Sequence, residues 1–142
     1  MFIGEYQHTI DEKGRVAVPS GFRRRLTKGA VVTRGIDNCL FLYTVEEWKK
    51  LAQKVMNLPL GQAKSRAFAR LMLAGAHEVS FDTQGRINLP THLIDYARLV
   101  KKVVIAGLYN RIELWDSSLW EEYKKKAEAE SEQIGESLGA IV

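Results

Sequence analysis

The sequence contains little of what several classes of protein need. Its only cysteine, Cys39, excludes an intrachain disulfide and a cysteine-cluster metal site. The three histidines, His8, His77 and His92, are too scattered to have metal-ligand spacing. No apolar run approaches the roughly 18 residues of a membrane span, and the first residues lack the basic start and apolar stretch of a signal peptide. We therefore expect a soluble cytoplasmic protein without metal, other cofactor or small-molecule substrate.

Positive charge is concentrated in the first half of the chain. Residues 1–70 contain 13 Lys and Arg against 6 Asp and Glu, a net charge of +7. Residues 71–142 contain 8 against 11, a net charge of −3. A basic half favours an anionic partner, and double-stranded DNA is the first candidate. A lysine-rich surface that is merely solvated is the alternative interpretation.

One motif occurs twice along the chain. Residues 11–19 read DEKGRVAVP and residues 82–90 read DTQGRINLP, so that Asp, Gly, Arg and Pro coincide. The similarity resumes where VVTRGIDN at 31–38 matches VVIAGLYN at 103–110. The sequence therefore predicts two copies of a unit of about 50 residues. Because each copy alone is too small to bury a good core, we expect the two to pack together as an intrachain pseudo-dimer.

Both copies have the pattern of short strands with a helix after the motif and another at the end. Strands are expected where apolar residues alternate or cluster, at 6–10, 15–18, 31–33, 40–43 and 78–81. Ser20 is expected to cap a short helix that ends near Leu26. Capping boxes at residues 44–47 and 118–121 predict the two longer helices.

A helix with one apolar face is expected at residues 62–74, after the breaker Pro59. We therefore divide the chain into a first repeat (1–57), a linking helix (58–75) and a second repeat with a C-terminal helix (76–142). Apolar residues of the two helices are candidates for packing across subunits, namely Ala63, Ala67, Phe68, Leu71, Met72, Leu119, Trp120 and Tyr123.

The chain resembles the MraZ family over nearly its whole length. The resemblance is carried by the N-terminal MFIGEY, both Asp-x-x-Gly-Arg-x-x-x-Pro segments, SRAF at 65–68 and NRIELW at 110–115. It implies a mainly β fold with helices (α+β), in which two tandem AbrB-like swapped-hairpin units form a pseudo-dimer barrel. It also implies a bacterial DNA-binding repressor of its own promoter and of a division and cell-wall gene cluster. Such a regulator binds short direct repeats in the nucleoid as a homo-oligomeric ring.

Six basic residues on or near the two motifs are candidate DNA contacts, namely Lys13, Arg15, Arg23, Arg24, Arg25 and Arg86. For the motif arginines the alternative is a structural pair with the aspartate four residues earlier, and for the others it is solvated charge. An arginine fork can bind phosphate or a guanine edge. The second copy has Ile94, Asp95 and Tyr96 in place of the arginine run. Equal DNA contact by both copies is therefore not expected.

The remaining motif residues, Asp11, Gly14, Asp82 and Gly85, are expected to be structural. Asp accepts backbone N–H bonds in a turn and Gly tolerates positive φ, whereas a carboxylate repels phosphate. A phosphate-cradling loop is the alternative for the glycines, but neither lies in a glycine-rich run.

Three classes of function are compatible with these residues. The first is a DNA-binding regulator without catalysis. The second is an oligomeric scaffold or regulator of a protein partner, whose basic surface is incidental. The third is an enzyme, for which the sequence offers no nucleophile–base set or cofactor loop. Salt-sensitive DNA binding discriminates the first class from the second.

Overall fold

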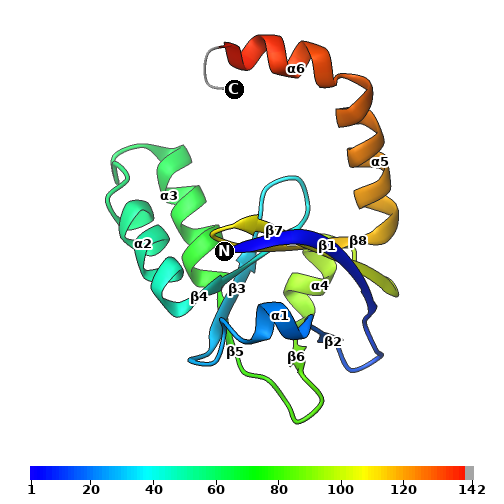
Figure 1. Ribbon diagram of the computed structural model, residues 1–142. Helices are drawn as coiled ribbons and strands as arrows, with labels where there is room; N and C mark the ends of the chain where they lie inside the picture. Colours follow the sequence, from blue (N-terminus) through cyan, green and yellow to red (C-terminus); the bar gives the residue numbers. More distant parts are fainter. Residues whose placement is uncertain (140–142) are drawn as a thin grey trace.

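The computed structural model describes residues 1–139, so the last three residues of the expected second repeat lie outside the described residues. Six strands form one antiparallel sheet in the order β1-β7-β8-β4-β3-β5, and β2 and β6 form a second sheet. Helices α1 and α4 lie with the small sheet on one side of the large sheet, and α2, α3 and α5 lie on the other (Figure 1). The α+β fold predicted from the sequence is therefore confirmed.

The strands of the large sheet are β1 (Phe2–Thr9), β3 (Ala30–Arg34), β4 (Leu40–Thr44), β5 (His77–Val79), β7 (Lys102–Tyr109) and β8 (Ile112–Asp116). The small sheet consists of β2 (Arg15–Ala17) and β6 (Arg86–Asn88). The helices are α1 (Ser20–Arg23), α2 (Val45–Met56), α3 (Ala63–Ala69), the π-helical η1 (Arg70–Ala74), α4 (Thr91–Ala97), α5 (Ser117–Ala129) and α6 (Ser131–Leu138).

The two copies exchange their first strands. Strand β1 of the first copy pairs with β7 of the second, and β5 of the second pairs with β3 of the first. In the centre of the sheet β4 pairs with β8, with Phe41 opposite Glu113. This exchange is what the swapped-hairpin resemblance implies, and it makes the chain a pseudo-dimer. Each copy completes the sheet of the other.

The large sheet is open, and residues 1–139 contain no closed barrel, contrary to the barrel that the resemblance implies. The reason lies in the edge strands. Strand β5 is three residues long, and β2 and β6 pair with each other. Nothing in this part of the chain therefore joins β1 at one edge to β5 at the other.

Both faces of the large sheet are covered, which explains its long apolar strands. In β4, Leu40 and Leu42 face the main core, whereas Phe41 and Tyr43 face a second cluster beneath α2, η1 and α5. The main core lies between the large sheet and the layer of β2, β6, α1 and α4. At its centre Val16 and Ile87, which pair across the small sheet, are both fully buried. The small sheet is thus fixed to the large one by apolar packing.

Helix starts follow the predicted capping chemistry in one of three cases. The Thr44 hydroxyl accepts a bond from the Glu47 N–H at 3.1 Å and begins α2, as predicted. The capping box predicted at residues 118–121 is wrong. The carboxylate of Asp116 caps α5 instead, by accepting a hydrogen bond from the Ser118 N–H at 3.1 Å. The cap by Ser20 is also wrong. Pro19 is extended, so α1 begins at Ser20 itself and ends at Arg23.

The linking helix expected at 62–74 is present as α3 followed by η1. It returns to the large sheet, where the Thr33 hydroxyl donates to the Met72 carbonyl at 2.7 Å. Met72 is only 4% exposed and packs with Phe41 and Tyr43. Of the predicted assembly stripe, Met72 is therefore a core residue, whereas Phe68 and Leu71 are exposed.

Candidate nucleic-acid interface

Each motif forms a turn that its own aspartate closes. Asp11 accepts bonds from the backbone N–H groups of Lys13 and Arg15 at 3.0 and 2.9 Å, and from Arg15 Nε at 2.7 Å. In the second copy Asp82 accepts from the N–H groups of Gln84 and Arg86 at 2.9 Å, and from Arg86 Nε at 2.8 Å. The structural pair between Asp and Arg is therefore present in both copies.

The glycines of the motifs adopt the backbone conformation that these turns require. Gly14 has φ +80° and Gly85 has φ +74°, where a side chain would be strained. A Cβ at Gly14 would also lie 2.8 Å from the Leu89 carbonyl oxygen. The two glycines therefore let the turns fold tightly against the other copy.

The two turns lie side by side because β2 and β6 pair. Their ends are joined by bonds from Val18 N–H to the Gly85 carbonyl at 3.1 Å and from Leu89 N–H to the Gly14 carbonyl at 2.8 Å. Arg86 Nη1 also lies 3.7 Å from Asp11 Oδ2, an ion pair between the copies. The strand exchange thus brings two motifs that are far apart in sequence into one surface.

Closing the turn does not bury the motif arginines. The side chains of Arg15 and Arg86 remain 34% and 26% exposed. The short bond to the aspartate uses Nε in each case, and a guanidinium has two further Nη groups with which it can donate to another acceptor. The aspartate therefore orients the arginine, and the arginine can still bind a phosphate or a base edge.

The turn geometry also controls the charge of the aspartates. The backbone N–H of Arg15 lowers the pKa of Asp11, and its guanidinium acts in the same direction. The backbone N–H and guanidinium of Arg86 lower the pKa of Asp82 in the same way. Both carboxylates are accordingly ionised at neutral pH, which keeps the arginines paired and fixed in orientation.

The arginine run of α1 divides into one packed residue and two exposed ones. Arg23 Nη1 donates to the Val18 carbonyl at 2.7 Å, and its guanidinium lies against Gly85, where any Cβ would collide with it. Arg24 and Arg25 are exposed, and the Arg25 guanidinium lies 6.0 Å from the centre of the Phe2 ring. The three successive arginines therefore lie in different surroundings.

Because the copies are exchanged, α1 of the first copy lies against the turn of the second. The position matching Arg23 in the second copy is Ile94, and its Cδ1 lies 3.0 Å from a Cβ placed at Gly14. The first turn therefore carries exposed Lys13 beside the uncharged Ile94, whereas the second turn, with neutral Gln84, lies beside Arg23. Sequence reasoning missed this exchange of neighbours. The signal that could have predicted it is the swapped-hairpin resemblance, which implies that the two copies exchange elements.

Comparisons with known proteins agree with the motifs. The family described as "MraZ protein, putative antitoxin-like" matches residues 1–71 and 72–138, one match for each copy. The chain belongs to the MraZ family. Relatives that this chain matches over nearly their whole length are named "Transcriptional regulator MraZ". One from Natranaerobius thermophilus is 49% identical over 97% of this chain and 96% of its own. One from Caldanaerobacter subterraneus subsp. tengcongensis is 46% identical over the same shares.

Within 1–139, His, Cys, Asp and Glu side chains form no group of three or more that is suited to hold a metal ion. In the same range, every helix is too short or too polar to cross a bilayer.

The aspartate turns predict a pH dependence of stability. The pKa of each turn carboxyl is lower in the folded chain than its ordinary value of 3.8 in the unfolded chain. Such a carboxyl stabilises the folded chain at pH values above 3.8. This stabilisation is lost as the pH falls below 3.8 and through the lower pKa of the folded chain. We expect the double variant Asp11→Asn, Asp82→Asn to unfold at a lower temperature than the wild type at pH 7. The difference in unfolding temperature between the two proteins should become smaller below about pH 3.8. Thermal unfolding between pH 2.5 and 7 measures this difference.

Asp95→Asn is the matched control, because Asp95 is an exposed aspartate of α4 outside both turns. A gap between wild type and the double variant that stays constant over this pH range would show that the turn carboxylates do not act through their charge.

Proposed function

We propose that this chain is a sequence-specific DNA-binding regulator that represses its own promoter and a downstream division and cell-wall gene cluster. It acts in the cytoplasm on the nucleoid, without catalysis. The proposal rests on one observation above all. Two aspartate-locked arginine turns lie side by side on one surface, and exposed Lys13 lies within the first of them. The names of its full-length relatives support the same class of function.

The arrangement suits DNA for a physical reason. Arg15 and Arg86 are fixed in orientation before binding, so less conformational entropy is lost when they reach a base edge or phosphate. Exposed Lys13, Arg24 and Arg25 add positive charge that is free to neutralise phosphates. Positioned arginines beside adaptable cations correspond to base readout combined with backbone attraction.

One chain offers few such groups, so specific affinity requires several chains. We infer that chains assemble as a ring and that successive chains bind successive short direct repeats. Linking the sites makes each further contact intramolecular and raises its effective concentration. Weak contacts of single chains then add to a strong total.

A scaffold or a regulator of a protein partner is the competing function. It would also need an oligomer, but it gives no reason for two oriented arginines beside exposed cations. The two functions differ in their response to salt. Counterion release makes DNA affinity fall steeply as salt rises, whereas a surface with incidental charge has no specific DNA affinity to lose.

The proposal is tested by titrating the full chain with its own upstream DNA and with a scrambled duplex of equal length. We expect tighter binding to the upstream DNA at every salt concentration and a linear fall of log affinity with log salt for both duplexes. Fluorescence anisotropy at four or more salt concentrations provides the measurement. Equal affinity for the two duplexes would contradict the proposal and would favour the scaffold function.

The exposed arginines of α1 provide a charge test. We expect Arg24→Ala, Arg25→Ala to weaken binding to all duplexes and to reduce the salt slope by up to about 2, because each phosphate contact contributes about 0.9. Both residues are exposed, so the fold should be retained. The same titration measures the slope.

Lys125→Ala, Lys126→Ala is the matched control. It removes the same charge from exposed positions of α5, on the other side of the large sheet. If the control lowers the slope as much as the arginine variant, net charge rather than this surface governs binding.

The exchange of neighbours predicts the effect of the two motif arginines. Sequence position alone favours a larger role for Arg15, since the arginine run follows it. In the structure the first arginine of that run, Arg23, lies against the turn of Arg86. We therefore expect Arg15→Ala and Arg86→Ala each to weaken specific binding by at least about tenfold, roughly 1.4 kcal/mol. Anisotropy titrations measure both affinities.

Arg15→Lys and Arg86→Lys separate orientation from charge. Lysine keeps the charge but lacks the planar fork, so these variants should lose preference for upstream DNA while retaining most of the salt slope. Thermal unfolding reports any loss of the turn itself. Full specific binding by Arg86→Ala would show that only the first motif reads DNA.

A further inference from the structure

The outer face of the large sheet is finished differently in the two copies. In the first copy α2 follows β4, and then α3 and η1 return so that Met72 packs against the sheet. In the second copy α5 follows β8 in the same way, but α6 leads away from the body of the molecule (Figure 1). A cavity of about 620 Å³ lies beside α5, where residues 1–139 contain no counterpart of η1.

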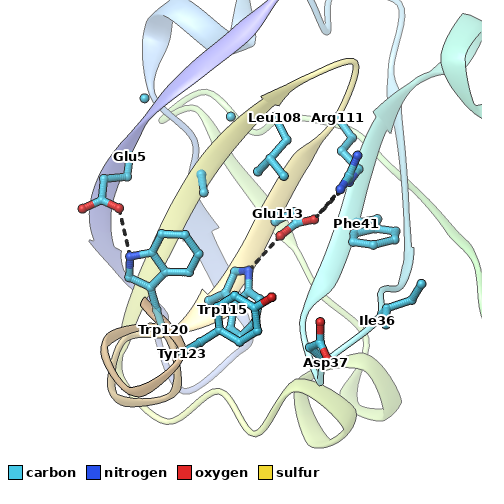
Figure 2. A pocket seen from close by; sticks show the side chains of 13 residues that line it. Glu5, Ile36, Asp37, Phe41, Leu108, Arg111, Glu113, Trp115, Trp120 and Tyr123 are labelled. Atoms are coloured by element: carbon cyan, nitrogen blue, oxygen red, sulfur yellow. Dashed lines mark hydrogen bonds and ion pairs between the residues drawn. The ribbon is translucent and has the colours of Figure 1, made fainter. Parts of the chain in front are cut away.

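This cavity lies across the junction of the two copies. The first copy contributes Glu5 of β1, Phe41 of β4 and Asp37 of the loop between β3 and β4, and the second contributes β7, β8 and α5 (Figure 2). Below it β1 pairs with β7 and β4 pairs with β8, which are pairings between the copies. Its volume is within the range of small-molecule sites, about 300–1,000 Å³. A ligand bound there would therefore contact both copies.

The wall formed by β8 and α5 is aromatic and fixed in orientation. The ring centre of Trp115 lies 5.4 Å from that of Trp120 and 5.1 Å from that of Tyr123. Trp115 Nε1 donates to Glu113 at 3.0 Å, and Trp120 Nε1 donates to Glu5 at 2.9 Å (Figure 2). Because both indole N–H groups are already bonded, the wall offers a ligand apolar surface and π-electron density.

The cavity already holds one cation between a carboxylate and a ring. The guanidinium of Arg111 lies 4.8 Å from the centre of the Phe41 ring, and its Nε and Nη2 both lie 3.0 Å from Glu113 Oε2 (Figure 2). Glu113 is only 7% exposed. The negative ring face and the carboxylate attract the same positive group. This cation belongs to the chain itself, so the pair it forms is neutral.

Another part of the cavity has a carboxylate and rings but no cation of its own. Asp37 is exposed and lines the cavity together with Trp115 and Tyr123, which is 48% exposed. Arg98 and Lys126 line a neighbouring hollow that these three residues share. Neither forms an ion pair with Asp37, which has none within residues 1–139.

The other two acids that line the cavity are neutralised. Arg111 pairs with Glu113, and Lys124 Nζ lies 3.2 Å from Glu5 Oε1. Asp37 is therefore the carboxylate of the cavity whose charge no described ion pair compensates. The cavity favours a positive ligand over a negative one, because an anion would meet both this charge and the negative faces of the rings.

The loop that carries Asp37 is held in place by α4. The Tyr96 hydroxyl donates to the Gly35 carbonyl at 2.7 Å, and the Asn38 side chain donates to the Tyr96 carbonyl at 3.3 Å. Asp37 itself has φ +70°, a conformation that Asp and Asn adopt more readily than other residues with a side chain. The carboxylate is thus presented by a fixed loop, so little ordering of the loop is needed when a ligand binds.

We propose that this cavity binds a small organic cation, a protonated amine with an apolar body. Its ammonium lies between the Asp37 carboxylate and the rings of Trp115 and Tyr123, and its apolar body packs against Trp120 and Leu108. The chain then has a ligand site on the side of the large sheet opposite the motif turns. The site does not depend on the proposed function, and its test contains no DNA.

Three probes with the same apolar body and different charge test the site on the full chain. Phenethylammonium is positive, phenethyl alcohol is neutral and phenylacetate is negative. We expect a saturable change in tryptophan fluorescence with phenethylammonium, because Trp115 and Trp120 line the cavity. Phenethyl alcohol should bind about tenfold more weakly, and phenylacetate should not saturate. Calorimetric titration measures the affinities, and phenethylammonium should also raise the unfolding temperature.

Asp37→Asn separates charge from shape. Asn tolerates the φ of +70° at this position, so the fold should be retained. The affinity for phenethylammonium should fall to that for phenethyl alcohol, whose own affinity should not change. Asp95→Asn is the matched control, because it removes the same charge from an exposed position that does not line the cavity.

Tyr123→Leu separates the π-electrons of the wall from its apolar surface. We expect the affinity for phenethylammonium to fall by about threefold, with a smaller change for phenethyl alcohol. Tyr6→Leu is the matched control, since Tyr6 is 47% exposed and packs on Phe22 rather than in the cavity. If Tyr123→Leu unfolds at a lower temperature than Tyr6→Leu, the comparison of Asp37→Asn with Asp95→Asn decides alone.

Three results would each overturn the proposal. The first is the absence of saturable binding of phenethylammonium to the wild type. The second is equal affinity for phenethylammonium and phenethyl alcohol, which would show that the cavity does not select positive charge. The third is an unchanged affinity for phenethylammonium in Asp37→Asn, which would place the bound cation elsewhere on the chain.

Discussion

The structure depends on the exchange of strands between the two copies. Neither copy has enough apolar surface to form a core alone, and each contributes an edge strand to the sheet of the other. The same exchange pairs β2 with β6 and buries Val16 against Ile87 at the centre of the main core. Stability of the fold and proximity of the two motifs therefore have one cause. A change that separated the copies would remove both.

The exchange also makes each half of the candidate DNA surface composite. Arg23 donates to the end of its own β2, yet its guanidinium packs on Gly85 of the other copy. Ile94 packs on Gly14 in the reciprocal position. One positive charge of the first copy, that of Arg23, thus lies at the turn of the second. Because Asp11 contacts both motif arginines, the orientation of one turn also depends on the position of the other.

Local patterns were sufficient to predict much of the fold. The duplicated motif predicted the two copies, and the spacing of Asp and Arg indicated the turn closure at Asp11 and Asp82. The pattern within a segment did not predict a residue's role where that role depends on contacts outside the segment. Asp116 caps α5 because its backbone is still extended at the end of β8, so that the helix begins at the next residue. Met72 is a core residue because η1 returns to the large sheet. The contact between Arg23 and Gly85 was not predicted, because it joins the two copies.

The large sheet separates the layer of the two motifs from the helices on its other face. Its alternating side chains bury Leu40 and Leu42 towards the motif layer, and Phe41 and Tyr43 towards α2, η1 and α5. The candidate DNA contacts therefore lie on one side of the sheet, and the helices α2, η1 and α5 lie on the other. A change on the helical side can then leave the motif surface intact. Because both layers pack on the same strands, the sheet also fixes the position of the motif turns relative to those helices.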